Sequence, residues 1–271
     1  MIRMDILSIQ ELKSIQLDIL KVVHTFCQES DIKYSIACGT LLGAVRHKGY
    51  IPWDDDIDIY MYRTEYNRFV QEFPDVYKGN YRLISLERDT KWDMPYAKVY
   101  DDRTILKERA LMNVQIGINI DVFPIDNVPD DEEEWIQFDT KRRKIHTLLQ
   151  LQRIDVGKKW WRLLKHPSFL KARLISVFMP RRKVAERMDR FIQQYKNRET
   201  SFVFESCGGI HAKKRFSKTV FDTLVDFSFE GQKFYGFEQY DEYLSKIYGN
   251  YMQLPPEEKR VTHHSFEAYR K

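Results

Sequence analysis

The chain has 271 residues, with 44 Lys and Arg against 40 Asp and Glu, which gives a formal net charge of +4. Charged residues make up 31% and apolar residues 43%, and this composition excludes a disordered polyelectrolyte and a fibrous repeat. The three cysteines are an odd number without a C-x-x-C pair, which favours a reducing compartment. Neither a secretory leader nor a run of 18 apolar residues is visible, so we expect a cytoplasmic protein.

The first half of the chain mixes helical and strand patterns. Apolar residues at helical spacing predict a helix from Ile9, with Ser8 as its N-cap and Glu11 completing a capping box. The other expected elements, in chain order, are a strand at 34–38, a Gly39-Thr40 turn, a helical stretch at 41–46, a strand at 56–61, a helix capped by Thr64, and strands at 81–86, 96–101 and 117–123. This mixture predicts an α+β fold.

The charge pattern divides the chain into three parts. Residues 1–140 carry 16 basic and 26 acidic side chains, whereas residues 141–187 carry 15 basic and two acidic ones. A helix capped by Asp131 with Glu134 leads into the basic residues. A second helix, over Tyr240–Tyr248 and stopped by Gly249, lies in the C-terminal part of the chain. We therefore expect a core over 1–130, a basic helical insertion over 131–200, and a part over 201–271 that completes the core.

Four carboxylates fall within five positions of the run Pro52–Ile59. Because side chains alternate along a strand, Asp56 and Asp58 share one face while the intervening isoleucines point to the core. Two carboxylates about 7 Å apart repel one another unless a cation lies between them. Carboxylate oxygens suit Mg²⁺ or Mn²⁺, with phosphate oxygens filling the remaining coordination sites. A solvated acidic loop is the alternative explanation for this run.

A third carboxylate lies in the apolar strand pattern of residues 116–124. An unpaired buried Asp is costly, and Asp121 would be explained if it faced Asp56 and Asp58 across the sheet. Three carboxylates from two strands can hold one or two cations for an in-line phosphoryl displacement. The alternative is an Asp at the frayed end of a strand.

Upstream, Gly39-Thr40 before a helix start is a candidate phosphate-binding turn.

The run from Gly39 to Ile59 resembles the signature of the LicD family, whose relatives include the fukutin group. These proteins belong to the nucleotidyltransferase superfamily, in which a Gly-Ser/Thr turn precedes an Asp-x-Asp strand and a third carboxylate. The resemblance continues at residues 120–126, 226–231, 240–244 and 248–256, and covers about residues 30–130 and 200–265. It implies a nucleotidyltransferase-like core, with a small mixed sheet flanked by helices, plus the inserted basic segment.

The resemblance also implies an activity. Such enzymes transfer a phosphorylated alcohol to a sugar hydroxyl in a metal-dependent reaction, here phosphocholine from CDP-choline to a bacterial cell-surface glycan precursor such as teichoic acid or lipopolysaccharide. A ribitol or glycerol phosphate transferase using another CDP-alcohol is one alternative. An ordinary nucleotidyltransferase, which moves a nucleotide from an NTP to a small molecule, is another.

By this resemblance, Asp56 and Asp58 hold a divalent cation on the donor diphosphate. Asp121 completes the site and is placed to receive the proton of the acceptor hydroxyl. Gly39 and Thr40 would bind phosphate, with Arg46 and Lys98 as cationic supports. Asp54, His263 and His264 are further candidates. For Arg46, Lys98 and the two histidines, ordinary surface charge is the competing explanation.

A trimethylammonium group needs aromatic faces, because it accepts and donates no conventional hydrogen bond. The candidates for a choline cage are Trp53, Tyr60, Trp92 and Tyr96.

The basic segment 141–187 interleaves cations with large apolar groups, which is typical of a segment lying on an anionic membrane. A groove for an anionic polymer and plain solvated helix faces are its alternatives. Nucleic acid is not expected as a partner, because such a function would leave the Asp-Ile-Asp strand unexplained.

Overall fold

The computed structural model describes residues 5–108, 113–154, 175, 178–207, 215–262 and 266–271. The helices over these residues are α1 (Ile9–Glu29), α2 (Cys38–Arg46), α3 (Arg63–Val76), α4 (Glu132–Arg153), α7 (Arg181–Ile192), α8 (Thr219–Asp222) and α9 (Tyr240–Tyr248), with 3₁₀ turns η1 (Gln193–Tyr195) and η2 (Glu257–Lys259). The strands are β1 (Ser35–Ile36), β2 (Asp58–Tyr62), β3 (Tyr81–Ile84), β4 (Ala97–Asp101), β5 (Thr104–Glu108), β6 (Asn119–Val128), β7 (Phe202–Glu205), β8 (Phe216–Ser217), β9 (Leu224–Phe229), β10 (Gln232–Phe237) and β11 (Phe266–Arg270).

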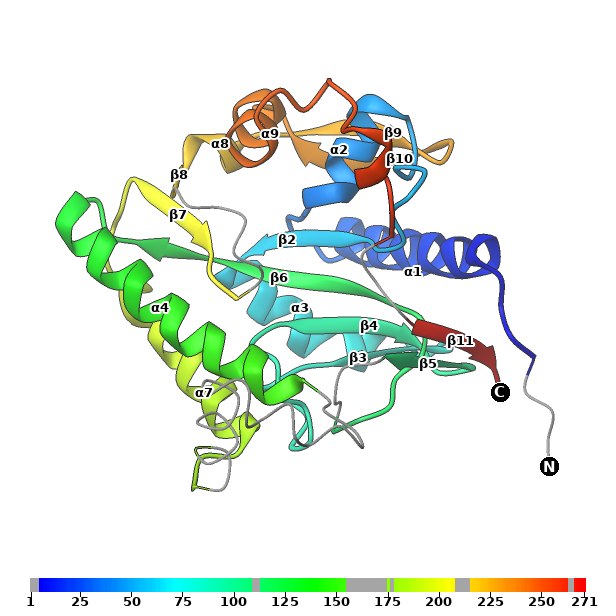
Figure 1. Cartoon of the computed structure of the whole chain (residues 1–271), viewed down its shortest axis with the longest axis horizontal. Coiled ribbons are helices and arrows are strands. Elements are labelled where there is room, and N and C mark those ends of the chain that lie inside the picture. The colour runs from blue at the N-terminus through cyan, green and yellow to red at the C-terminus, as the bar shows by residue number, and fades with distance from the viewer. Residues whose placement is uncertain (1–4, 109–112, 155–174, 176–177, 208–214, 263–265) are drawn as a thin grey trace.

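A mixed sheet forms the centre of the molecule (Figure 1). Within the described residues its strands follow the order β1-β2-β6-β4-β3, and β7 pairs with β6 and with β8. The β2–β6 pair is parallel, while β4 and β7 run antiparallel to β6. Both β4 and β7 pair with β6, β4 through residues 119–122 and β7 through residues 125–128. The α+β class predicted from the sequence is confirmed.

Helices cover one face of this sheet, and a smaller layer covers the other. Helices α1 and α3 pack on the first face, with Phe26 of α1 against Phe69 and Phe73 of α3. On the other face lie α2, α9 and the hairpin β9–β10 (Figure 1). Because strand residues alternate, the fully buried Ile59 faces one layer and its neighbour Asp58 faces the other. We call the face that carries Asp58 the front face.

Local sequence signals predicted several helix ends correctly. Helix α1 begins after Ser8, whose side chain accepts a hydrogen bond from the Glu11 amide, and the capping box is complete. Helix α4 begins after Asp131, which accepts from the Glu134 amide. Helix α9 ends before Gly249, whose positive φ of 68° is easily adopted by glycine.

Several predicted boundaries were wrong, among them the strand expected over 117–123, which is β6 and continues to Val128. The strand expected from Asp56 begins at Asp58, although the parallel pairing extends to the carbonyl of Ile57, which accepts from the Asp121 amide. The expected Gly39-Thr40 turn is part of α2, because the chain turns one residue earlier, at Cys38, with a φ of 48°. Helix α3 begins at Arg63, without a side-chain cap from Thr64.

The two-stranded sheet of β5 and β11 was not predicted. Strand β11 pairs with β5 in antiparallel register, and Ile6 bridges to Tyr269. This pairing joins residues more than 150 positions apart, so no local pattern reveals it. It brings the last described segment back to the sheet beside α1 (Figure 1).

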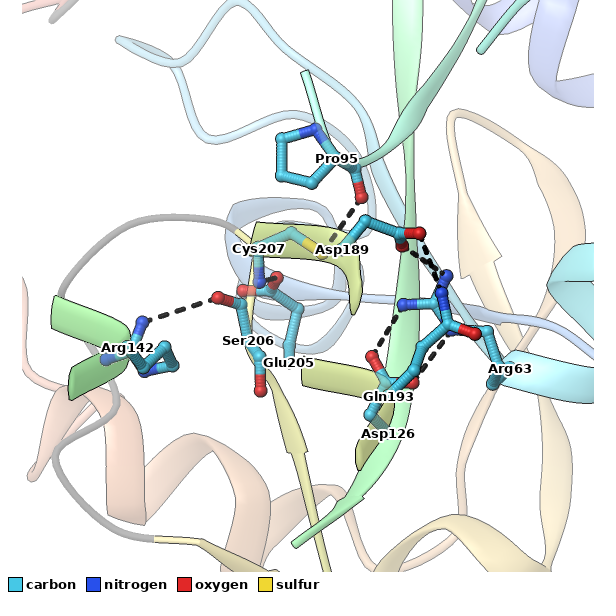
Figure 2. Close-up of polar contacts among 9 residues, drawn as sticks. All are labelled: Arg63, Pro95, Asp126, Arg142, Asp189, Gln193, Glu205, Ser206 and Cys207. Atoms are coloured by element: carbon cyan, nitrogen blue, oxygen red, sulfur yellow. Dashed lines mark hydrogen bonds and ion pairs between the residues drawn. The ribbon is translucent and has the colours of Figure 1, made fainter. Parts of the chain in front are cut away.

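A buried ion pair fixes α3 to the sheet. Arg63 donates from Nε and Nη2 to the two carboxylate oxygens of Asp126, both at 2.7 Å, and its Nη1 lies 3.2 Å from Asp189 of α7 (Figure 2). Asp126 is 2% exposed. Burial raises the pKa of Asp126, and Arg63 opposes that shift. A bidentate guanidinium is the geometry that best compensates for the desolvation of such a pair.

Helices α4 and α7 pack together along one end of the sheet (Figure 1). Several of their basic residues have internal partners: Arg142 pairs with Asp139, Arg181 pairs with Asp93, and Arg182 donates to backbone carbonyls of the 86–92 loop. The positive charge of residues 141–187 is therefore partly structural. Its central stretch, 155–174, lies outside the described residues.

Candidate active site

Three ionic side chains form a row across adjacent strands on the front face. Asp58 of β2 is the register partner of Asp121 of β6, and Asp121 is the register partner of Lys98 of β4. Lys98 Nζ lies 2.6 Å from Asp121 Oδ1 and donates to Asn119 Oδ1 at 2.9 Å. The predicted neighbourhood of Asp58 and Asp121 therefore exists, and Lys98 is an ion-pair partner inside it.

The acidic residues of this region repel one another. Burial raises the pKa of Asp58, and the charges of Asp56, Asp121 and Asp54 raise it further, while Lys98 opposes the shift. Burial raises the pKa of Asp54 to about 7, with added contributions from the charge of Asp56 and a hydrogen bond to it. Such mutual destabilisation of negative charge is what a bound cation would relieve.

Asp54 lies over the first turn of α2. A Cβ at Gly39 would overlap with Asp54 Oδ2, so the Asp54 carboxylate makes its close approach where Gly39 has no side chain. Ala37 precedes the helix and offers no capping side chain. The Asp54 carboxylate therefore lies beside the first turn of α2.

Thr40 positions the acidic strand. Its side chain is 3% exposed, and its hydroxyl oxygen accepts a hydrogen bond of 2.9 Å from the Asp58 amide. Beside it, the Cys38 amide donates to the Tyr243 hydroxyl at 3.2 Å, which ties α2 to α9. Gly39 and Thr40 thus lie next to the carboxylates.

Asp55 belongs to the structure of the loop. It is 5% exposed, and its Oδ2 accepts a 2.5 Å hydrogen bond from the Thr262 hydroxyl. Its carbonyl accepts from Gln16 Nε2, which also donates to the Asn119 carbonyl. These contacts fasten the acidic loop to α1 and to the segment before β11. Neither Gln16 nor Thr262 carried a recognisable sequence signal.

Arg46 lies in the last turn of α2, at the opposite end from Gly39. Its Nη1 donates to the Tyr251 carbonyl at 2.7 Å, and its Nε contacts His47 Nε2 at 2.9 Å. The contacts of Arg46 therefore secure the segment after α9. The structure does not bring Arg46 to the row of Asp58, Asp121 and Lys98.

The four candidate cage aromatics do not form one group. Trp92 is 1% exposed and donates its indole N–H to the Tyr96 carbonyl at 2.7 Å, as a core residue does. Trp53 lies near His47 and under the guanidinium of Arg260. Tyr60 and Tyr96 both contact Phe123, a residue that sequence reasoning did not select.

The carboxylates have the chemistry of a Mg²⁺ or Mn²⁺ site, because they are hard oxygen ligands with unfavourable mutual repulsion. As the side chains stand, no three His, Cys, Asp or Glu residues converge at metal-binding distances within the described part of the chain. The candidates His263 and His264 lie outside the described residues.

Among the helices the structure describes, none is long and apolar enough to cross a bilayer.

Comparison with known proteins gives a consistent result. The family model described as "LicD/FKTN/FKRP, nucleotidyltransferase domain" matches residues 31–163. The chain is 34% identical over 269 residues to the lipopolysaccharide cholinephosphotransferase LicD of Haemophilus influenzae, an alignment that covers 97% of this chain and 98% of that protein. An uncharacterized protein of Rickettsia typhi is 42% identical over 76 residues, which are 28% of this chain and 25% of the relative.

Proposed function

Since the chain belongs to the LicD family and is a transferase, we propose that it moves phosphocholine from CDP-choline to a sugar hydroxyl of a lipopolysaccharide precursor. The supporting observation is the row of Asp58, Asp121 and Lys98 on the front face, beside the N-terminus of α2. The full-length similarity to a cholinephosphotransferase supports this choice of donor and acceptor.

In the proposed reaction, the acceptor hydroxyl oxygen attacks the phosphorus that carries choline. The bond from this phosphorus to the bridging oxygen of the diphosphate breaks, and CMP leaves with that oxygen. Asp121 receives the proton of the attacking hydroxyl, and Lys98 holds the Asp121 carboxylate in place at 2.6 Å. The amides of the first turn of α2 orient the donor phosphates.

Asp56, Asp58 and Asp121 are the residues that would hold Mg²⁺ or Mn²⁺. Their donor set fits, because burial and like charge raise the pKa of Asp58 and leave the cluster in need of a positive charge. When bound, a divalent cation would neutralise the diphosphate and the charge that develops on the leaving CMP. Thr40 contributes by fixing the Asp58 backbone, and Gln16 and Thr262 by fixing the acidic loop.

We also propose that the protein works at the cytoplasmic face of an anionic membrane. Phe178 is 89% exposed and Ile154 is 39% exposed, and both flank the contact between Gln152 Nε2 and the Met179 carbonyl. The α4–α7 pair thus presents apolar side chains at the end from which the basic stretch departs. Exposed cations and apolar groups together favour an interfacial surface.

Cys27, Cys38 and Cys207 are free thiols, in keeping with a reducing compartment.

The decisive experiment is a donor panel. The protein is incubated with Mg²⁺, a lipopolysaccharide acceptor and CDP-choline, CDP-ribitol or CDP-glycerol, and CMP release is measured. CDP-choline should give the highest kcat/KM, and Asp58→Asn should abolish release. Preference for another CDP-alcohol would refute the choice of donor, and pyrophosphate release from an NTP would show an ordinary nucleotidyltransferase. CMP release that Asp58→Asn leaves unchanged would refute the metal-site assignment.

A further inference from the structure

Three aromatic side chains continue the front face beyond the ionic row. Tyr60 follows Asp58 by two residues on β2, and Phe123 follows Asp121 by two residues on β6, so both rings share the face of the carboxylates. Tyr60 and Phe123 are register partners, with ring centroids 6.1 Å apart. Tyr96 directly precedes β4, and its ring centroid lies 4.5 Å from that of Phe123.

These three residues are buried but keep a small exposed fraction. The exposed fractions are 7% for Tyr60, 8% for Tyr96 and 9% for Phe123. The neighbouring strand residues that point to the opposite layer, Ile59, Val122 and Ala97, are all 0% exposed. The aromatic platform formed by Tyr60, Phe123 and Tyr96 therefore lies at the front-face border of the hydrophobic core.

An acidic residue borders the platform. Glu205 ends β7 and is the register partner of Ile125, which shares the face of Phe123. The Glu205 side chain therefore lies on the front face, on the same side of the sheet as Phe123.

The end of β7 is fastened next to the start of β4. Cys207 Sγ donates to the Pro95 carbonyl at 3.0 Å, and Pro95 directly precedes Tyr96 (Figure 2). The Cys207 amide donates to Glu205 Oε1 at 2.6 Å, and Arg142 Nη1 donates to the Ser206 carbonyl. Glu205 is therefore held on the side of β6 where Tyr96 meets Phe123.

We propose that Tyr60, Phe123 and Tyr96, together with Glu205, form the subsite for the trimethylammonium group of choline. This assignment rests on the proposed transfer of phosphocholine. A quaternary ammonium is attracted to ring faces and to a carboxylate, and it makes no hydrogen bond that the rings would have to satisfy. The platform begins two strand residues, about 7 Å, beyond the carboxylate row, and a two-carbon spacer separates choline nitrogen from its phosphate.

The subsite replaces two of the four aromatic residues expected from sequence. Trp92 is enclosed in the core and Trp53 contacts Arg260, whereas Phe123 joins the platform because it is the register partner of Tyr60. Glu205 supplies the negative charge that distinguishes choline from a neutral alcohol such as glycerol. The same rings could instead stack on cytosine, and the experiment separates these uses.

The test compares donors with and without choline. Affinities for CDP-choline, CDP-glycerol and CDP are measured by titration calorimetry with Mg²⁺, and KM for CDP-choline by CMP release. In Glu205→Gln, which keeps the hydrogen-bond acceptor for Cys207, the Kd and KM for CDP-choline should rise roughly tenfold, while the Kd for CDP and CDP-glycerol stays within about twofold. Phe123→Leu should behave alike. The exposed Glu238→Gln, matched in chemistry, should change none of these values.

Two results would overturn the subsite. An equal loss of affinity for CDP and CDP-choline in Phe123→Leu would show that the rings hold cytosine, and unchanged CDP-choline affinity in both variants would place choline elsewhere. The isosteric Glu205→Gln guards against a folding defect in the more buried Phe123 variant. The binding measurements stand apart from turnover: a wild-type protein that binds CDP-choline through Glu205 but releases no CMP would refute the proposed transfer and keep the subsite.

Discussion

Asp58 lies directly opposite Asp121 in the parallel pairing of β2 with β6, so two carboxylates share one position on the front face of the sheet. The register of β2 with β6 aligns the strand that carries Asp58 with the strand that carries the third carboxylate, Asp121. The pairing converts a sequence pattern spread over more than 60 residues into a single charged site. Burial raises the pKa of Asp58, and the nearby charges of Asp56 and Asp121 raise it further.

Replacement of Asp58 by Asn should separate metal binding from folding. The neutral amide removes the repulsion with Asp56 and Asp121, so we expect the Tm without metal to be unchanged or higher. The rise in Tm that Mg²⁺ causes in the wild-type protein should disappear. Thermal unfolding with and without Mg²⁺ measures both effects, and Asp75→Asn, an exposed carboxylate, should keep the full metal response.

Lys98→Met should weaken both the fold and the reaction. Removal of the ammonium leaves Asp121 without its lysine partner, at a cost of about 3 kcal/mol in the free energy of unfolding. The double variant Lys98→Met/Asp121→Asn should recover part of this loss, which urea unfolding would show. The exposed pair of Lys233 and Asp226 is the control, since Lys233→Met should cost less than about 0.5 kcal/mol. Additive losses in the double variant would contradict a direct interaction.

Sequence reasoning succeeded where the determining contacts are local. The capping box at Ser8 and the glycine stop at Gly249 depend on neighbours within four residues, and both predictions are confirmed. The proximity of Asp121 to Asp58 was predicted from the cost of burying an unpaired carboxylate, and the register shows it. In contrast, the Arg63–Asp126 pair and the place of Phe123 depend on strand register, which no residue pattern specified.

The Arg63–Asp126 pair should be among the most sensitive positions of the fold. Asp126→Asn leaves a buried guanidinium with a neutral partner, and we expect a loss of about 3 kcal/mol in the free energy of unfolding. Arg63→Lys retains the charge but not the two parallel hydrogen bonds, so it should cost about 1–3 kcal/mol. Asp18→Asn, in an exposed pair with Lys21, should have no measurable effect in the same denaturant titration.

His146 should make the protein sensitive to mild acid. Burial, together with the charges of Arg142 and Arg153, lowers the pKa of His146 from 6.5 to about 4. The unfolded chain therefore takes up a proton more readily, and stability is complete above pH 6.5 and falls as the pH drops from 6.5 toward 4, by on the order of 3 kcal/mol. His146→Gln should remove this part of the pH dependence. A wild-type and a variant curve that stay parallel between pH 4 and 6.5 would contradict the assignment.

Exposed cations on α7 should support membrane adsorption. Lys183, Arg187 and Arg190 lie at helical spacing on its exposed side. Their joint replacement by Gln should reduce sedimentation with vesicles that contain anionic lipid, and should leave the already weak sedimentation with neutral vesicles unchanged. A matched triple change at Glu238, Asp241 and Glu242 should not reduce binding. Adsorption that is equal on neutral and anionic vesicles, and insensitive to salt, would contradict the membrane proposal.

The hydrogen bond between Thr262 and Asp55 also affects the order in which the protein can fold. It joins residues 207 positions apart, so the acidic loop receives this anchor only after nearly the whole described chain has been synthesised. Gln16 of α1 holds the same loop from another side. A nascent chain can therefore pair β2 with β6, which already places Asp58 opposite Asp121, before the acidic loop receives its anchor from Thr262.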